Sequence, residues 1–228
     1  MSTLYLGDTH GNWAGLARTV EGVLDKHPVQ RIVQIGDCGV YRYAWAEGFV
    51  NLYGIPLEFI DGNHEDHDFI WSGDYASKFV GVTYIPRGTI RDGVLYIGGA
   101  ESIDKEYQIA QGSWSADEQV SIEDRDRTIA AIEAYMASGS RIHTVVAHDT
   151  TYKGANHILD NEIGARYKSF SRTHERLEMI FEVARPDRWI HGHWHIPCRY
   201  CINGCEFIGL DKIDRNDDHT KIGSWLVL

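Results

Sequence analysis

Residues 31–39 read RIVQIGDCG, an apolar run that stops abruptly at Gly36-Asp37. Two other short apolar runs end in a similar way: residues 3–8 read TLYLGD, and residues 56–63 read PLEFIDGN. Short apolar runs bounded by turn residues are typical of strands that are buried on both faces of a sheet. The three runs therefore predict three strands, each ending in a glycine and an acidic or amide side chain.

Segments with helical spacing lie between these runs. Apolar residues recur every three or four positions over residues 12–27, and residues 43–53 are a second expected helix. Strands that alternate with helices favour a largely parallel sheet covered on both faces. Ligands of such sheets bind at the carboxyl ends of the strands, so the polar strand endings are expected to converge on one site.

The rest of the chain mixes helices and strands. Residues 124–137 and 174–184 have the spacing of amphipathic helices, whereas residues 101–123 are polar without a clean period and predict a loop or insertion. The remaining segments that predict strands are 81–86, 89–100, 143–149, 197–210 and 223–228. No repeat or linker divides the chain, so residues 1–228 are expected to form a single domain.

The composition limits the classes of function. Of the 228 residues, 43% are hydrophobic and 24% charged, and the net charge is −11. This negative balance disfavours a protein that grips nucleic-acid backbone. No apolar run approaches the ~20 residues that a membrane span needs. The first strand begins almost at Met1, which leaves no room for a signal peptide, so we expect a cytoplasmic protein.

Seven side chains at or after the strand endings are candidate metal ligands. They are Asp8, His10, Asp37, Asn63, His148, His193 and His195. Such oxygen and imidazole ligands suit manganese, iron, zinc, cobalt or nickel, and no thiolate set demands zinc. Seven ligands are too many for one ion, whereas a carboxylate bridging two ions about 3.5–4 Å apart would use them economically. We therefore expect two divalent ions, with manganese as the first candidate.

The motifs GDTHG, GD, GNHE, H and GHWH follow one another between residues 7 and 195. In this order and on these strand ends they resemble the calcineurin-like metallophosphoesterase family. The resemblance implies an α/β fold, a four-layer α/β/β/α sandwich of two mixed sheets. It also implies a two-metal-dependent hydrolase of phosphoric esters.

The resemblance implies a role for each motif residue. One ion would be held by Asp8, His10 and His195, and the other by Asn63, His148 and His193, with Asp37 as the bridge between them. A hydroxide between the ions would attack phosphorus in line. His64, which follows a ligand directly, would assist the leaving oxygen.

The chain departs from the protein-phosphatase branch of the family at the second motif. That branch continues Gly-Asp-x-x-Asp-Arg-Gly, whereas Val40 and Tyr41 stand at the Asp and Arg positions here, and Arg42 comes one residue late. The acidic partner that orients the catalytic histidine is therefore missing or supplied from elsewhere. Acidic residues that could approach the site in this way are Glu65, Asp66, Asp104 and Asp149. The run of motifs is more similar to a subgroup of small phosphoesterases from actinobacteria and their phages.

Three cations are candidates to hold phosphate: Arg42, Arg87 and Lys105. The acidic balance around them favours a small phosphorylated substrate, such as a monoester, a diester or a nucleotide, over a long polyanion. A protein serine/threonine phosphatase is the alternative, a nuclease is disfavoured by the net charge, and a non-catalytic scaffold would be expected to lose ligands. Neither the substrate nor the oligomeric state follows from the sequence.

The cysteines of CRYCINGC, residues 198–205, suggest a zinc knuckle, a disulfide or a plain hairpin. The spacing lacks a fourth zinc ligand, and closed structural zinc sites have four. The Asn203-Gly204 pair favours a hairpin whose cysteines are ordinary strand residues. Cys38 has no basic partner that would make it a nucleophile.

Overall fold

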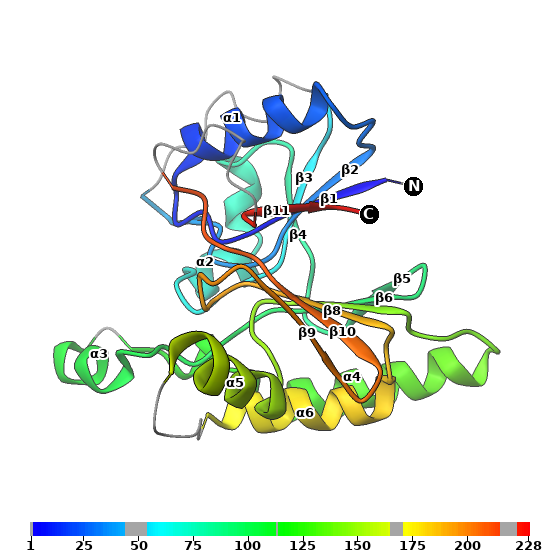
Figure 1. Ribbon diagram of the computed structural model, residues 1–228. Coiled ribbons are helices and arrows are strands. Elements are labelled where there is room, and N and C mark those ends of the chain that lie inside the picture. The colour runs from blue at the N-terminus through cyan, green and yellow to red at the C-terminus, as the bar shows by residue number, and fades with distance from the viewer. Residues whose placement is uncertain (1, 44–53, 113, 165–170, 215–222) are drawn as a thin grey trace.

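The computed structural model describes residues 2–43, 54–112, 114–164, 171–214 and 223–228. Its strands form two sheets that face each other (Figure 1). The first has the order β11-β1-β2-β3-β4, with bounds Trp225–Val227, Thr3–Leu6, Arg31–Gln34, Leu57–Phe59 and Val82–Tyr84. The second has the order β5-β6-β7-β8-β10-β9, with bounds Thr89–Arg91, Val94–Ile97, Thr144–Ala147, Arg188–His191, Cys205–Gly209 and Cys198–Ile202.

Both sheets are mixed. In the first, β1 to β4 are parallel and β11 pairs with β1 in the antiparallel sense. In the second, β6, β7, β8 and β10 are parallel, and the outer strands β5 and β9 are antiparallel to their neighbours. The parallel pairing of β1, β2 and β3 places their carboxyl ends at one edge, as the sequence predicts.

Helices cover the outer faces of both sheets. Figure 1 shows α1 (Trp13–Leu24) over the first sheet, and α4 (Ile122–Ala137), α5 (Tyr152–Ile158) and α6 (Arg172–Ala184) over the second. The order of layers is therefore helix, sheet, sheet, helix. This arrangement confirms the predicted α/β/β/α sandwich.

The burial of single strands explains why they read as continuous apolar runs. In β1, Leu4 and Leu6 pack in the core beneath α1, whereas Tyr5 packs between the two sheets. In β7, Val145 packs in the core on the helix side and Val146 between the sheets. Alternate side chains point to opposite faces of a strand, so a strand covered on both faces needs apolar residues at every position.

The segment expected to be a loop contains a helix. Residues 101–123 include α3 (Lys105–Gln111) and a 3-10 turn (Ala116–Glu118), and α4 begins at Ile122, two residues before the expected start. None of the residues of α3 is buried, so this helix needs no apolar face and leaves no period in the sequence. The short helix α2 (His67–Trp71) and α5 were also not expected. The expected helix at residues 43–53 falls, except for its first residue, outside the described residues.

The cysteine-rich stretch is the hairpin β9–β10. Asn203 and Gly204 at its turn have positive φ angles of 52° and 83°, which two-residue hairpin turns require. All four cysteines are free, and Cys201 is exposed while Cys198 and Cys205 are buried. No disulfide joins these cysteines, and neither candidate metal-ligand group found among the described residues includes a cysteine.

Among the described residues, the helices are too short or too polar to cross a membrane.

Candidate metal centre

The seven candidate ligands lie on the loops that follow the carboxyl ends of five strands. Asp8 and His10 follow β1, Asp37 follows β2 and Asn63 follows β3, all in the first sheet. The remaining three histidines follow strands β7 and β8 of the second sheet. Each sheet therefore contributes ligands to one edge of the sandwich, and the residues arrive there from positions up to 187 apart in the chain.

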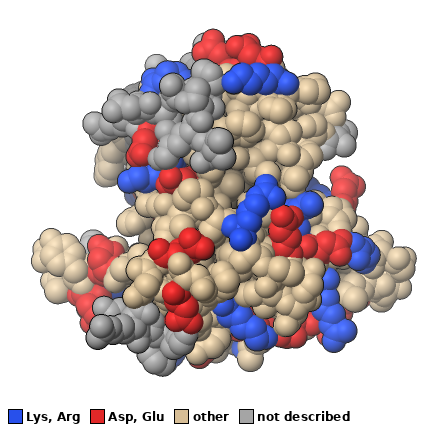
Figure 2. Space-filling model, viewed as in Figure 1, with Lys and Arg blue, Asp and Glu red and all other residues tan. Residues whose placement is uncertain are grey.

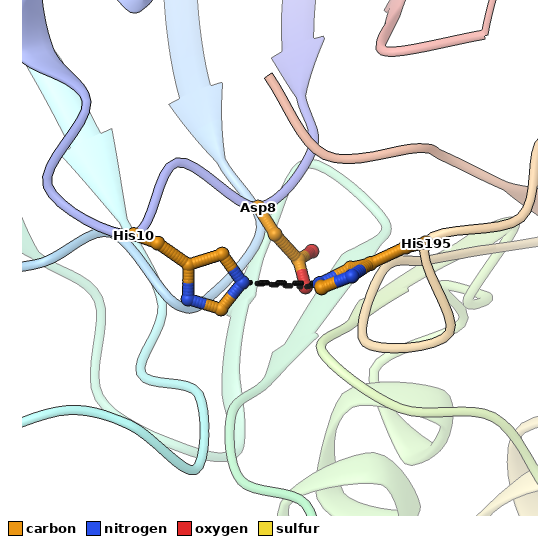
Figure 3. A group of neighbouring side chains, drawn as sticks. All are labelled: Asp8, His10 and His195. Atoms are coloured by element: carbon orange, nitrogen blue, oxygen red, sulfur yellow. Dashed lines mark hydrogen bonds and ion pairs between the residues drawn. The ribbon is translucent and has the colours of Figure 1, made fainter. Parts of the chain in front are cut away.

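One ligand group consists of Asp8, His10 and His195. The Nε2 atoms of His10 and His195 lie 3.0 Å apart, and His195 Nε2 lies 3.0 Å from Asp8 Oδ2. Figure 3 shows the two rings and the carboxylate turned toward one another. Their backbones come from β1 on one side and from the loop after β8 on the other.

The second group consists of Asp37, His148 and His193. His148 Nε2 lies 3.5 Å from Asp37 Oδ2 and 3.2 Å from the side-chain oxygen of Asn63. The same Asp37 Oδ2 atom lies 3.8 Å from His10 Nδ1. Asp37 is thus the carboxylate that stands between the two groups.

These distances suit divalent ions. Ligands bound at about 2.0–2.2 Å to one ion lie about 2.8–3.6 Å from each other in tetrahedral or octahedral arrangements. His195 Nε2, at 3.0 Å from His10 Nε2 and from Asp8 Oδ2, and His148 Nε2, at 3.2–3.5 Å from the Asn63 and Asp37 oxygens, agree with this spacing. His10 Nε2 and Asp8 Oδ2 are farther apart, at 4.0 Å. The donors are carboxylate, amide and imidazole, and no thiolate is among them, so the residues fit a pair of ions such as manganese.

Without metal ions, the surroundings shift the pKa values of the candidate histidines in different directions. Burial lowers the pKa of His10 and of His193, which favours the neutral imidazole that a metal requires. Burial also opposes the charge on His148, but Asp37 more than offsets it and raises the pKa of His148 to about 10. His148 Nδ1 lies 3.0 Å from the carbonyl oxygen of Ile35, which leaves Nε2 directed at the ligand group.

Unusual backbone conformations concentrate at this edge. Four of the candidate ligands, His10, Asp37, His193 and His195, have positive φ angles between 48° and 65°. Left-handed backbone in residues other than glycine costs free energy and is kept where the surrounding structure requires it. The loops therefore hold these side chains inward at a cost in conformational energy.

Two glycines allow the ligands to approach the backbone. Gly36 has a φ angle of 104°, and a Cβ atom there would collide with the His148 ring. A Cβ atom at Gly192 would collide with the Asp8 carboxylate. Any side chain at these positions would displace a candidate ligand.

Glu65 holds two of the loops together. Its buried carboxylate accepts hydrogen bonds from the backbone amides of Asp37, Cys38 and Gly39 and from that of Gly62. Four amides from the loops after β2 and β3 thus converge on one side chain. Glu65 lies behind the ligands, as expected for a residue that supports the site, but its oxygens face backbone and not His64.

A profile of calcineurin-like phosphoesterases matches residues 1–197. The chain belongs to the calcineurin-like phosphoesterase family. It is accordingly a metal-dependent phosphoesterase, and the family uses a pair of divalent metal ions. The family predicted from the motifs is confirmed.

Three solved structures are similar to the chain. A putative 5'-nucleotidase from Staphylococcus aureus in complex with alpha-ketoglutarate has 13% identity and a TM-score of 0.52 over 92% of this chain and 48% of its own. NAD nucleotidase from Haemophilus influenzae has 10% identity and a TM-score of 0.48 over 92% of this chain and 44% of its own. Phosphopantetheinyl hydrolase from Mycobacterium tuberculosis has 11% identity and a TM-score of 0.43 over 100% of this chain and 96% of its own.

The chain spans about half the length of the two nucleotidases that it matches. At these identities the likeness to the Staphylococcus aureus protein shows the fold alone. No curated protein sequence matches the chain.

His64, which the motif resemblance predicts to be the catalytic histidine, is exposed beside the candidate ligands. Its backbone amide donates to Asp37 Oδ1 at 2.9 Å, and its ring centroid lies 5.5 Å from that of His10. Within the described residues, no side chain forms a hydrogen bond with the His64 imidazole. The orienting acid of the protein-phosphatase branch thus has no counterpart in the described part of this phosphoesterase.

The acidic residues considered for that task are engaged elsewhere. Asp66 accepts from the amide of Phe69 at the start of α2, and Asp104 accepts from Gln108 on α3. Asp149 lies 2.8 Å from His174 and accepts from the Trp194 indole at 2.9 Å. Because Trp194 stands between two candidate ligands, Asp149 supports the GHWH loop and does not orient His64.

The three predicted phosphate-holding cations have partners within the protein. Arg87, only 5% exposed, contacts Asp61, Asp124 and the carbonyl oxygens of residues 117–119 through its guanidinium nitrogens. Arg87 is a structural residue, and its buried, fully engaged guanidinium contradicts the predicted contact with substrate phosphate. Lys105 pairs with Glu101 at 2.7 Å. Arg42 pairs with Asp66 at 3.4 Å but keeps half of its side chain exposed.

Sequence reasoning missed two residues that support the centre from residues 101–123. Ser102 accepts a hydrogen bond from the Asn63 amide, and Glu118 accepts one from Ser102. Both are buried. A polar residue in an aperiodic stretch carries no signal of its burial, so only the folded chain reveals this connection.

Proposed function

We propose that the chain hydrolyses a small phosphoester at this edge of the sandwich. Asp8, His10 and His195 would hold one ion, and Asn63, His148 and His193 the other. The observation that carries the proposal is Asp37, whose Oδ2 atom lies within 4 Å of a nitrogen from each ligand group. A carboxylate in that place is suited to bind both ions at once.

A bound pair of divalent ions supplies an activated water for attack on phosphorus and positive charge for the phosphoryl oxygens. Residues of the chain would assist the leaving group and hold the substrate phosphate. His64 is exposed next to the candidate ligands, and its imidazole forms no hydrogen bond with the described residues, so it is available to give a proton to the leaving oxygen. Its backbone amide donates a hydrogen bond to Asp37, which fixes the position of the His64 backbone beside the candidate ligands.

Arg42 is more exposed than Lys105, the other remaining candidate cation for the substrate phosphate. It is half exposed and lies beside Asp66, three residues after the candidate ligand Asn63. Its ion pair is long, at 3.4 Å, and such exposed pairs contribute at most about 1 kcal/mol. A substrate phosphate could therefore displace Asp66 at little cost.

A small substrate is favoured over a protein or a nucleic acid. The positions that carry Asp and Arg in protein phosphatases hold Val40, which is fully buried, and Tyr41. On the face shown in Figure 2, the blue side chains of the described residues are interspersed with red ones and form no continuous basic tract. Both observations argue for a nucleotide or another compact ester.

The test uses protein stripped with a chelator and reloaded with manganese. The reloaded protein should hydrolyse p-nitrophenyl phosphate or bis(p-nitrophenyl) phosphate, and a panel of monoesters, diesters and nucleotides should identify the class of substrate. Asp37→Asn should lose activity and at least one of the two ions. Full activity in Asp37→Asn would exclude the two-metal site, and a protein that binds metal but hydrolyses no ester would be a scaffold.

A further inference from the structure

A chain of hydrogen bonds runs from the buried Glu118 to the candidate ligand Asn63. The Ser102 hydroxyl donates to Glu118 Oε2 at 2.7 Å, and the Asn63 amide nitrogen donates to Ser102 Oγ at 3.0 Å. The Asn63 oxygen then faces His148 Nε2 at 3.2 Å. Glu118 is only 2% exposed, so water does not compete for these bonds.

Glu118 determines which group donates and which accepts in each of these hydrogen bonds. A carboxylate is an acceptor, so the Ser102 hydrogen is committed to Oε2 and the Ser102 oxygen must accept from its other neighbour. That neighbour is the Asn63 side chain, whose only donor is its nitrogen. The amide oxygen of Asn63 is consequently left on the side of the metal ligands, which is the orientation a metal needs.

The other oxygen of Glu118 is also occupied. Its Oε1 atom accepts from the backbone amide of Ser102 at 3.0 Å and from the Trp114 indole at 2.8 Å. Both groups can only donate. Oε1 and Oε2 are therefore not interchangeable, because only Oε2 faces the Ser102 hydroxyl.

The segment that carries Glu118 is firmly attached to the sandwich. The Glu118 carbonyl oxygen accepts from the amide of Ala100, and Arg87 donates to the carbonyl oxygens of Asp117 and Gln119. Two residues on, the amide of Val120 donates to Thr173 on α6. The carboxylate is thus held in place independently of Asn63.

We propose that Glu118 is a positioning residue of the metal centre, which acts through Ser102 to turn the Asn63 oxygen toward its ion. This inference rests on the proposed function, in which Asn63 is a ligand. It assigns residues 101–123 a part in metal binding. Groups that orient metal ligands commonly change metal affinity about 10–100-fold when they are replaced.

The substitution Glu118→Gln tests whether Glu118 determines the direction of these hydrogen bonds. The two obligate donors at Oε1 require the glutamine oxygen there, so its NH2 group takes the place of Oε2 and donates to Ser102 Oγ. The Ser102 hydrogen, which no longer has an acceptor at residue 118, is satisfied by pointing at residue 63, so the Asn63 amide turns its oxygen to Ser102 and its nitrogen toward the ion. We expect one manganese ion to bind about 10–100-fold more weakly, measured by calorimetric titration of the chelator-treated protein.

A second substitution distinguishes orientation from general damage. A carboxylate has an oxygen at both positions, so Asn63→Asp accepts from Ser102 and still offers an oxygen to the ion in the Glu118→Gln protein. In the otherwise unchanged protein the introduced carboxylate would face a Ser102 oxygen whose hydrogen is committed to Glu118. The gain in manganese affinity from Asn63→Asp should therefore be at least about tenfold larger in the Glu118→Gln background.

The matched control is Glu123→Gln, the same change at an exposed glutamate five residues further along. It should leave both manganese affinities within about twofold, whereas Ser102→Ala, which removes the link without reversing it, should weaken one ion less than Glu118→Gln does. Ser102→Ala also keeps the test valid if Glu118→Gln lowers the melting temperature too far for titration.

Two results would overturn the proposal. Manganese affinities like those of the unchanged protein in Glu118→Gln would do so, as would an equal gain from Asn63→Asp in both backgrounds, and either result leaves the proposed hydrolysis intact. If the unchanged protein bound fewer than two ions, the proposed function would fail first, and the role of Glu118 with it.

Discussion

The Nε2 atoms of His10 and His195 lie 3.0 Å apart, although 185 residues separate the two histidines in the chain. Among the described residues, neither imidazole has a buried hydrogen-bond acceptor at this atom other than Asp8, which lies 3.0 Å from His195 and 4.0 Å from His10. Two ring nitrogens and a carboxylate oxygen directed at one point are a set of electron-pair donors. A cation between them would satisfy all three.

Removal of one of these histidines should therefore affect one ion and spare the other. We expect His195→Ala to bind about one manganese ion per chain in place of two and to lose at least about 100-fold in kcat. Calorimetric titration and metal analysis after gel filtration would measure this. His27→Ala, at a partly exposed histidine after α1, is the control and should keep both ions. Two ions retained in His195→Ala would refute the ligand assignment.

His64 should matter for the leaving group and not for the metals. With His64→Gln we expect full manganese binding but a loss in kcat of about 10²–10⁴-fold for phenyl phosphate, whose leaving oxygen needs a proton. The loss for p-nitrophenyl phosphate should be much smaller, because that leaving group departs as the anion. Equal losses for the two esters would argue against proton donation by His64.

Five of the candidate ligands follow apolar runs that predict strands, whereas His193 and His195 follow β8 (Arg188–His191), where no strand was expected, and only the GHWH motif indicated them. Asp8, Asp37 and Asn63 stand where three parallel strands end, and topology alone brings such positions to one edge. From the strand pattern alone only a largely parallel sheet covered on both faces could be predicted. The second sheet, and with it the four-layer order, followed from the resemblance of the ordered motifs to the family.

The support around the ligands could not be predicted. Arg87 looked like a free cation, but its partner Asp61 is buried and its other contacts are carbonyl oxygens of a segment without periodicity. Glu118 and Ser102 belong to that same segment. Hydrogen bonds between residues distant in sequence depend on the tertiary fold, and polarity in a sequence does not indicate whether a side chain is exposed.

Glu65 should contribute to stability, because it joins the loops after β2 and β3. In Glu65→Gln one acceptor oxygen becomes an NH2 group that faces backbone amides, so two of the four amides lose their partner. Buried donors without partners cost about 1–3 kcal/mol each, and we expect the free energy of unfolding to fall by about 2–6 kcal/mol in urea titrations. The control Glu21→Gln, on the exposed face of α1, should change it by less than about 0.5 kcal/mol. A Glu65→Gln protein as stable as its parent would mean that the loops do not depend on this carboxylate.

Arg87 and Asp61 form a buried ion pair. The loss of stability when this pair is removed should depend on pH. Burial alone would raise the pKa of Asp61, but Arg87, followed by His67, holds it below its usual range. The pair therefore contributes stability above about pH 4, the pKa of an unfolded aspartate, and loses it as the pH falls further. Arg87→Met leaves the Asp61 carboxylate buried with His67 as its remaining basic neighbour, at a cost of about 3–5 kcal/mol at pH 7.5.

This deficit should shrink as the pH is lowered from 7.5 to 5. Without Arg87, burial raises the pKa of Asp61, and a proton taken up by Asp61 or by His67 removes the unpaired charge. Urea unfolding of Arg87→Met and of its parent at both pH values measures the difference. The control Arg199→Met removes an exposed partner of Glu206 and should cost less than about 1 kcal/mol at either pH. A deficit in Arg87→Met that stays constant with pH would show that the lost contacts to carbonyl oxygens, and not the charge on Asp61, account for the destabilisation.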